Sequence, residues 1–168
     1  STYSTAITLD TTPPTISAFA ISNINSNGYI NKATKDAGNI LLSFTTSDNL
    51  SGIAGNYYSI NNGTWIAVTN NTDITSLLTD GVYNFQLKTV DNCGNFTISE
   101  AITFIVDTRV PTAVDGLSGV IRLNNIIQFN ASASSDVEAY EIRAGGTDWS
   151  TATVITKIVT NQTGIITH

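Results

Sequence analysis

A short string near the start of the chain returns almost a hundred residues later, and this spacing limits the architectures that the sequence can adopt. Residues 10–15 read D-T-T-P-P-T and residues 107–112 read D-T-R-V-P-T, an interval of 97 residues. A repeat of this length matches one β-sandwich, whose core is large enough to stand alone. We therefore expect two domains, residues 11–107 and 108–168. Residues 1–10 would be the closing strand of a preceding domain or a donor strand.

The composition favours a polar but weakly charged surface. The chain has 13 acidic and 7 basic residues, against 26 Thr, 18 Asn and 16 Ser. Such surfaces are typical of extracellular and virion proteins, and Thr and Asn suit strands and their turns. The net charge of −6 argues against nucleic acid as a partner, because no basic stripe would meet the phosphates. No apolar run of 18 residues occurs, so we expect no membrane insertion.

Short runs of alternating apolar residues, separated by turn residues, predict an all-β fold of tandem β-sandwiches without helices. Asn61-Asn62-Gly63 predicts a hairpin, since Asn and Gly adopt positive φ at low cost. The first domain would contain seven strands, the number in an immunoglobulin-like sandwich. These strands are Thr15–Ile21, Asn39–Asp48, Tyr57–Ile60, Thr64–Val68, Asp73–Leu78, Gly81–Asp91 and Phe96–Val106.

Alternation within these runs also predicts which side chains share one face. The predicted sets are Ile40, Leu42 and Phe44; Tyr83, Phe85 and Leu87; and Ile98, Ile102, Phe104 and Val106. Tyr83 also follows a turn at the start of the sixth strand, in the sequence L-T-D-G-V-Y. This is the position of a tyrosine corner, in which the hydroxyl bonds to nearby backbone. The alternative is an ordinary core tyrosine.

Several motifs together resemble bacterial Ig-like repeat domains. The motifs are D-T-T-P-P-T-I, S-D-N-L-S-G-I-A, Y-S-I-N-N-G-T-W, L-T-D-G-V-Y-N-F and V-D-N-C-G-N, within residues 11–107. Cys93 stands where a small residue such as Ala is more usual. The resemblance implies a sandwich that occurs in tandem in cell-surface proteins, in secreted enzymes as an accessory module, and in phage tail proteins.

The second domain shows a different resemblance. The segment S-D-V-E-A-Y-E-I-R-A-G-G-T-D-W-S-T-A-T-V-I is similar to fibronectin type III-like domains of phage tail-tip host-attachment proteins. Phe129 stands where that family usually has Trp. Residues 112–168 supply about five strands, so we expect an incomplete domain that lacks two closing strands. Either the chain is a fragment of a longer string of domains, or residues 1–10 of one subunit complete the last domain of another.

Aspartate and asparagine residues predict a calcium site at one end of the first domain. In a seven-strand sandwich, the start of the first strand lies beside the second-to-third and sixth-to-seventh loops. Asp10, Asp48, Asn49, Asp91 and Asn92 would therefore converge, and calcium takes six to eight oxygen ligands from such groups. The alternative is that these side chains only close turns onto their own backbone.

The sequence offers few residues that could form a catalytic site. The single histidine is His168, the last residue, so a Ser-His-Asp or Cys-His arrangement would lack a firmly positioned general base. No zinc-ligand spacing is present. The single cysteine, Cys93, excludes an internal disulfide. Trp65, Trp149 and the pair Tyr57-Tyr58 are candidates for stacking on sugars, against a role in core or edge packing.

These patterns predict a non-enzymatic structural or adhesive module of an extracellular fibre, a phage tail fibre or tip, or a bacterial surface protein. It would act as a spacer and present loops for host or surface recognition. Its partners would be neighbouring domains or subunits of the same fibre and a cell-surface glycan or protein. One alternative is a self-assembling filament subunit joined by β-strand donation. Another is an accessory module of a secreted polysaccharide-degrading enzyme.

Overall fold

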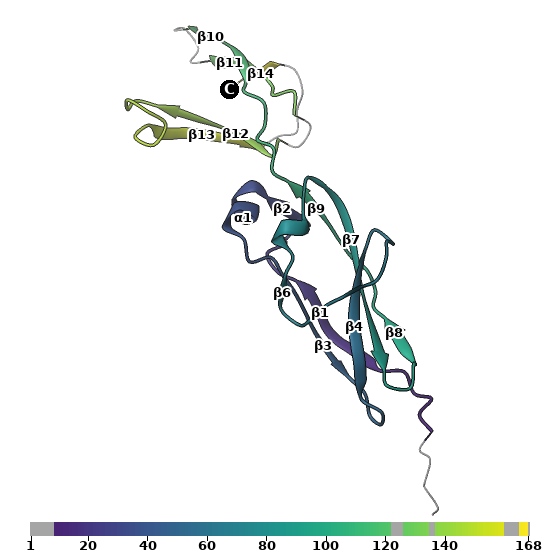
Figure 1. The fold of residues 1–168 in the computed structure, drawn as a ribbon. Coiled ribbons are helices and arrows are strands. Elements are labelled where there is room, and N and C mark those ends of the chain that lie inside the picture. The colour runs from purple at the N-terminus through teal and green to yellow at the C-terminus, as the bar shows by residue number, and fades with distance from the viewer. Residues whose placement is uncertain (1–8, 122–125, 135–136, 160–164, 168) are drawn as a thin grey trace, which may run out of the picture. The chain divides into compact units, whose positions relative to one another are not determined.

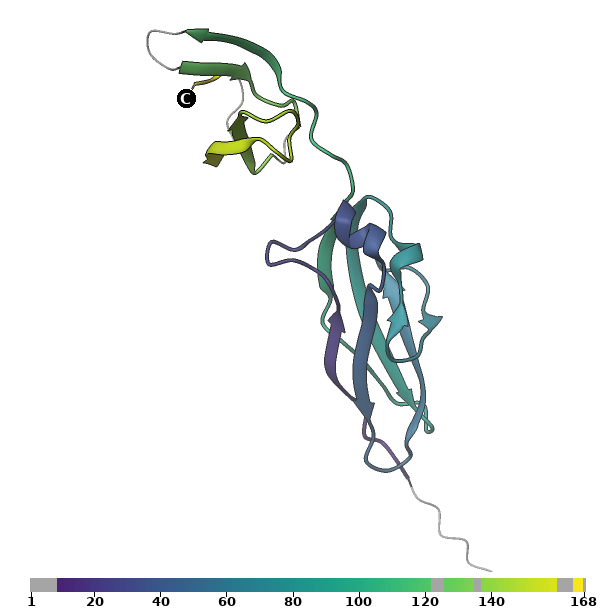
Figure 2. The same ribbon diagram turned by 90° about the vertical axis from the view of Figure 1, so that its left-hand side faces the viewer.

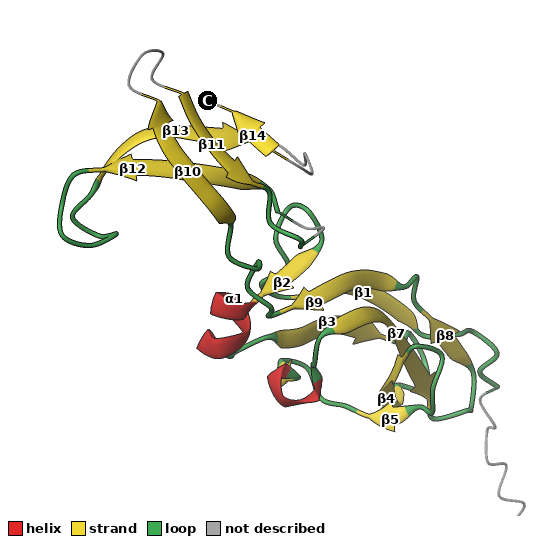
Figure 3. Cartoon of the chain, turned by 90° about the horizontal axis from the view of Figure 1, so that it is seen from above, coloured by secondary structure: helices red, strands yellow, loops and turns green. Residues whose placement is uncertain are grey.

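The computed structural model describes residues 9–121, 126–134, 137–159 and 165–167. The fold is all-β, as predicted, with several sheets arranged as sandwiches. The chain forms two compact units, Ser1–Arg109 and Val110–His168. Helical segments among the described residues are limited to α1 (Lys32–Ala37) and a short 3₁₀ turn (Thr75–Leu77) (Figure 3). None of the described helices is long and apolar enough to cross a membrane.

Two sheets build the first unit (Figure 1). The smaller sheet has the order β1–β3–β6, and the larger has the order β2–β9–β7–β4–β5, with β8 also paired to β7. All pairs are antiparallel except β2 with β9, which run parallel. The strands are β1 (Thr15–Ile21), β2 (Tyr29–Asn31), β3 (Leu41–Ser47), β4 (Ile53–Ile60), β5 (Ile66–Ala67), β6 (Thr72–Asp73), β7 (Gly81–Asp91), β8 (Phe96–Ile98) and β9 (Ile102–Asp107).

Side chains from both sheets meet in one core. Stacked or tilted rings of Tyr58, Tyr83, Phe85 and Phe104 form its centre, with ring centroids 5.5–6.2 Å apart. Such offset pairs add to the stabilisation that area burial provides. The predicted core faces of β3 and β7 are confirmed. The buried cluster consists of Ile21, Ile30, Ile40, Leu42, Phe44, Tyr58, Ile74, Leu78, Tyr83, Phe85, Leu87, Phe104 and Val106.

Two predicted strands are wrong in part. Asp73–Leu78 is a two-residue strand followed by a 3₁₀ turn, because the Asp73 carboxylate accepts the Thr75 amide and starts the turn. The predicted strand Phe96–Val106 is interrupted at Ser99, whose hydroxyl accepts the Leu87 amide in place of a strand carbonyl. Ile98 therefore leaves the core face and is 42% exposed.

The structure also contains a strand and a helix that we did not predict, β2 and α1. Asn31 caps the helix by accepting the Thr34 amide at 2.9 Å, and Gly38 ends it with a φ of 72°. Both cap residues are typical of helix ends. The helix has only six residues and buries none of them, so it leaves no apolar periodicity in the sequence.

The chain enters the first unit at one end and leaves it at the other (Figures 1 and 2). The entry segment is held by two long-range bonds: Asn95 Nδ2 donates to the Asp10 carbonyl (3.2 Å), and Thr97 Oγ1 to the Pro14 carbonyl (2.5 Å). The exit follows β9, which lies between β2 and β7 in the larger sheet. Force applied along the chain would therefore act across the length of this unit.

Five strands are described in the second unit. The sheets have the orders β10–β11–β14 and β12–β13. Phe129 and Tyr140 are buried, with ring centroids 5.2 Å apart, and Ala131, Val137 and Ile142 pack against them. The strands are β10 (Asp115–Ile121), β11 (Ile126–Asn130), β12 (Ala139–Ala144), β13 (Thr153–Val159) and β14 (Ile165–Thr167).

Candidate metal centre

Three aspartates meet at the entry end of the first unit. Asp10 precedes β1, Asp48 follows β3 and Asp91 ends β7, and one carboxylate oxygen of each lies within 4.8 Å of the others. Asp10 and Asp91 are 6% and 1% exposed. The chain thus gathers three acidic groups that are distant in sequence into one largely buried cluster, as the topological argument predicted.

Each of these aspartates also closes a turn through its Oδ1 atom. Asp10 accepts the Thr12 amide at 3.0 Å, and Asp48 accepts the Gly52 amide at 2.8 Å. Asp91 accepts two further amides in the turn before β8. The turn-closing role is therefore present together with the convergence, and the two readings do not exclude each other.

The Oδ2 atoms differ in their partners. Asp10 Oδ2 accepts the Ser51 amide at 3.0 Å, and Asp91 Oδ2 accepts Asn95 Nδ2 at 2.7 Å. Asp48 Oδ2 is buried and has no hydrogen-bond partner in the described part of the chain. A buried anionic oxygen without a donor is costly, so this atom is the one most in need of a cation.

Hydrogen bonding keeps two of these carboxylates ionised. Donation from the Ser51 side chain, then from the Thr12 amide, lowers the pKa of Asp10. The Leu50 and Gly52 amides lower the pKa of Asp48, although the nearby charge of Asp10 acts in the opposite direction. Ionised oxygens are the ligands that calcium requires.

The two predicted asparagines lie beside the cluster in different ways. Asn49 is exposed and lines a shallow cavity of about 190 Å³ next to Asp48. Asn92 uses its Nδ2 to donate to the Ser51 carbonyl at 2.7 Å, which ties the two loops together. The sequence argument missed Ser51 and Asn95, which bond to Asp10 across 41 and 85 residues.

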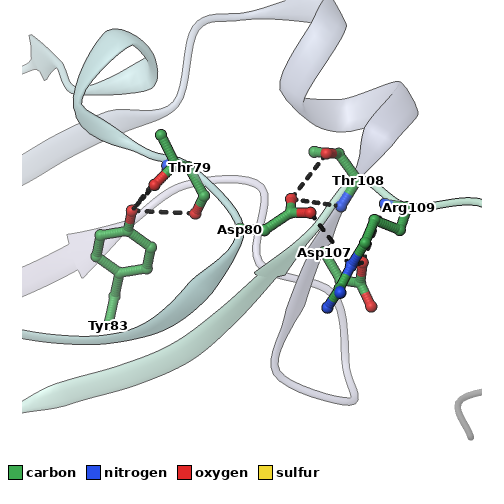
Figure 4. Close-up of polar contacts among 6 residues, drawn as sticks. All are labelled: Thr79, Asp80, Tyr83, Asp107, Thr108 and Arg109. Atoms are coloured by element: carbon green, nitrogen blue, oxygen red, sulfur yellow. Dashed lines mark hydrogen bonds and ion pairs between the residues drawn. The ribbon is translucent and has the colours of Figure 1, made fainter.

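A second polar cluster fixes the exit end of the same unit (Figure 4). The Asp80 carboxylate accepts both the amide (2.9 Å) and the hydroxyl (2.7 Å) of Thr108, and lies 3.4 Å from Arg109 Nε. Asp107 accepts the Arg109 amide at 3.0 Å. The hydroxyl and amide of Thr108, and then the charge of Arg109, lower the pKa of Asp80.

The predicted tyrosine corner is confirmed (Figure 4). Tyr83 Oη accepts the Thr79 amide at 2.7 Å and donates to the Thr79 carbonyl at 3.0 Å. The ring itself is buried in the core. The turn before β7, next to Asp80, is therefore fixed directly to the core.

The predicted sugar-stacking residues separate into two groups. Tyr58 is buried in the core, so it cannot contact a ligand. Trp65 and Trp149 are 36% and 61% exposed, and Tyr57 is half-buried. Arg143 lies over the Trp149 ring at 4.8 Å.

Cys93 is an exposed free thiol in the turn between β7 and β8, and His168 lies outside the described residues. Comparisons with protein-family models, curated proteins and solved structures gave no match.

Proposed function

We propose that this chain is a non-enzymatic spacer and adhesive module of an extracellular fibre, from a phage tail or a bacterial cell surface. The observation that carries the proposal is the position of the entry and the exit at opposite ends of the first unit (Figure 2). A module with this geometry extends a string of domains by its full length. The spacer role also draws on the Ig-like resemblance, and the two sheets, β1–β3–β6 and β2–β9–β7–β4–β5, form the two-sheet arrangement that a sandwich requires.

Both ends of the first unit are held in ways that suit a load-bearing role. Asn95 and Thr97 bind the entry segment, and Asp80 binds Thr108 at the exit. The parallel pair β2–β9 would be loaded in shear, so that its hydrogen bonds must break together. Calcium bound by Asp10, Asp48 and Asp91 would add a further link between the entry segment and two loops.

Single-molecule force spectroscopy of the chain held by its two ends tests the spacer function. We expect the first unit to unfold in one discrete event, releasing about 100 residues, or about 350 Å of contour length before the folded length is subtracted. Thr97→Val removes the bond to the Pro14 carbonyl and should lower the unfolding force. Gradual extension without a discrete event would contradict a load-bearing spacer.

The filament alternative depends on residues 1–10 as a donor strand. Residues 1–8 lie outside the described part of the chain, and Leu9 is 80% exposed. Deleting residues 1–9 distinguishes the two functions. A donor-strand filament would lose its polymers, whereas a spacer would keep both its oligomeric state and its unfolding event.

A further inference from the structure

The outer face of the larger sheet in the first unit carries an uncommon group of side chains. Cross-strand pairing places Lys88 of β7 between Tyr57 of β4 and Ile98 of β8. Trp65, just before β5, and Phe96, in β8, lie on either side of the lysine. We call these five residues the Lys88 surface. Phe96 and Ile98 are 52% and 42% exposed, so the surface faces solvent.

Aromatic rings hold the ammonium group of Lys88. Its Nζ lies 4.4 Å from the centroid of Phe96 and 5.9 Å from that of Trp65. Both distances are within the range of a cation–π interaction. Among the described residues, the ion pairs involve Lys32, Arg109 and Arg143, and none involves Lys88. The lysine therefore presents a positive charge that no carboxylate of the described chain neutralises.

Gly55 allows Tyr57 to lie against the sheet. A Cβ atom at Gly55 would come within 2.9 Å of Tyr57 Oη and 3.2 Å of two ring carbons. The tyrosine ring therefore occupies the space above the glycine, which only glycine leaves free. Beside it, a shallow cavity of about 420 Å³ is lined by small and polar residues, among them Ala54, Ala67, Thr69 and Thr72.

We propose that the Lys88 surface binds an acidic glycan, a sugar chain whose pyranose rings carry carboxylates. The carboxylate would pair with Lys88, and the apolar face of a pyranose would pack on Trp65 or Tyr57. Charge complementarity indicates this ligand. The unpaired ammonium group of Lys88 favours an anion, and the neighbouring aromatic rings favour an apolar surface next to that anion. The cavity beside Tyr57 offers the side chains of Asn56, Thr69 and Thr72 to the sugar hydroxyls. This site does not depend on the spacer function.

Titration of the full chain with two carboxylate sugars, trigalacturonate and 3′-sialyllactose, tests the proposal by calorimetry. We expect at least one of them to bind, and the neutral methyl ester of trigalacturonate and lactose to bind at least 10-fold more weakly than their acidic counterparts. Binding should weaken as salt is raised, because the pair with Lys88 is near the surface.

Three variants locate the site. Lys88→Gln and Trp65→Ala should each weaken binding at least 10-fold, whereas Lys32→Gln removes the same charge from α1 and should have no effect. The unfolding temperature of each variant shows that the first unit is still folded, and Lys88→Gln preserves the test if Trp65→Ala does not fold.

The proposal is wrong if neither acidic sugar binds, if Lys88→Gln binds as tightly as the natural chain, or if the neutral sugars bind equally well. A dimer that Lys88→Gln dissociates in light scattering would also overturn it, by assigning this surface to a second copy of the chain.

Discussion

The two units begin in the same way but build cores of different size. Asp10 accepts the Thr12 amide before β1, and Asp107 accepts the Arg109 amide before β10, both at 3.0 Å. The repeated Asp-Thr string therefore forms the same turn twice. It marks where a sandwich begins and carries no information about what completes it.

The repeated Pro-Thr pair is also used twice. Thr15 Oγ1 lies 2.8 Å from Ser47 Oγ in the first unit, and Thr112 Oγ1 lies 2.8 Å from Ser132 Oγ in the second. In both units the serine comes three residues after a buried phenylalanine, Phe44 or Phe129. The same Thr–Ser contact thus joins β1 to β3 in the first unit, and the segment before β10 to the segment after β11 in the second.

The two units share part of their strand pairing and differ in the strands that follow. The orders β1–β3–β6 and β4–β5 of the first unit correspond to β10–β11–β14 and β12–β13 of the second. The described part of the second unit has no counterpart of β7 and β9, the strands that carry Phe85 and Phe104. Local signals start a unit, whereas long-range strands determine how much apolar surface it buries.

The largest expected effect comes from the aromatic core of the first unit. Phe85 is fully buried against Tyr58, Tyr83 and Phe104, so Phe85→Ala should lower the free energy of unfolding of this unit by about 3–5 kcal/mol. Phe129→Ala, in the smaller described core of the second unit, should lower the free energy of unfolding of that unit by less. Chemical denaturation followed by tryptophan fluorescence measures both losses.

Each unit contains one tryptophan, which separates the two signals. Trp149→Phe leaves Trp65 to report on the first unit, and Trp65→Phe leaves Trp149 to report on the second. Phe85→Ala should leave the Trp149 transition unchanged. Equal losses of unfolding free energy for Phe85→Ala and Phe129→Ala would contradict the expected difference between the two cores.

Calcium should increase the difference in stability between the two units. At about 100 times its dissociation constant, calcium would raise the free energy of unfolding of the first unit by about 2.7 kcal/mol and its unfolding temperature by about 10 °C. Differential scanning calorimetry with calcium and with chelator measures the shift. Asp48→Asn should abolish it, because this change removes the oxygen that lacks a donor.

Asp148 in the second unit provides the matched control for calcium. Its Oδ1 also closes a turn, accepting the Ser150 amide at 2.8 Å, but it lies outside the three-aspartate cluster. Asp148→Asn should leave the calcium shift intact. Identical melting curves with calcium and with chelator would leave only the turn-closing role for Asp10, Asp48 and Asp91.

Two tyrosine hydroxyls allow a direct comparison at smaller energies. Tyr83 bonds to the Thr79 backbone, and Tyr140 accepts the Ser132 amide at 2.9 Å in a buried setting. Tyr83→Phe and Tyr140→Phe should each cost about 1 kcal/mol, with the larger loss at Tyr140, because the amide there is left buried without an acceptor. Denaturation of each unit tests this, and a neutral Tyr83→Phe would show that the corner adds no stability.

Mild acid should produce the smallest difference, because most of the carboxylates involved, those of Asp73, Asp80 and Asp148, are exposed to solvent, which screens their interactions. A lowered pKa stabilises the folded unit fully above about pH 4, and that stability is lost as the pH falls through the folded pKa. The first unit should therefore lose more stability below pH 4 than the second, and thermal unfolding at a series of pH values measures this. The largest causes of the lowered pKa values are hydrogen bonds from Ser51 to Asp10, Leu50 to Asp48, Thr75 to Asp73, Thr108 to Asp80 and, in the second unit, Ser150 to Asp148.

The sequence predicted the long strands best. The bounds of β1 and β7 match the expected ranges Thr15–Ile21 and Gly81–Asp91. In β7 the burial alternates regularly, which is a strong signal, whereas β1 has a register shift between Ser17 and Ala20 that the sequence did not predict. The helix α1 was missed, although Asn31 and Gly38 are typical caps, since it has six residues, none of them buried, and these carry no apolar period. The interruption at Ser99 was missed because its cause, a bond to Leu87, joins two strands.

The candidate metal centre was predictable only in its carboxylates. Strand order is enough to bring Asp10, Asp48 and Asp91 to one end of a sandwich. The bonds of Ser51 and Asn95 to Asp10 depend on loop conformations that no local pattern fixes. The Lys88 surface likewise depends on the register between neighbouring strands, which a single sequence does not specify.

Hydrogen bonds from backbone amides to aspartates stabilise the turns, whereas the described residues form few ion pairs. This difference determines how the stability of the fold depends on salt. In the described residues, the ion pairs join Lys32 to Asp36, Arg109 to Asp80 and Asp107, and Arg143 to Glu141. In the pairs of the first unit, those of Lys32 and Arg109, at least one member is well exposed. Exposed pairs contribute little, and dissolved salt screens them. Hydrogen bonds within a turn are much less sensitive to dissolved ions. We expect the first unit to keep its shape from fresh water to brine.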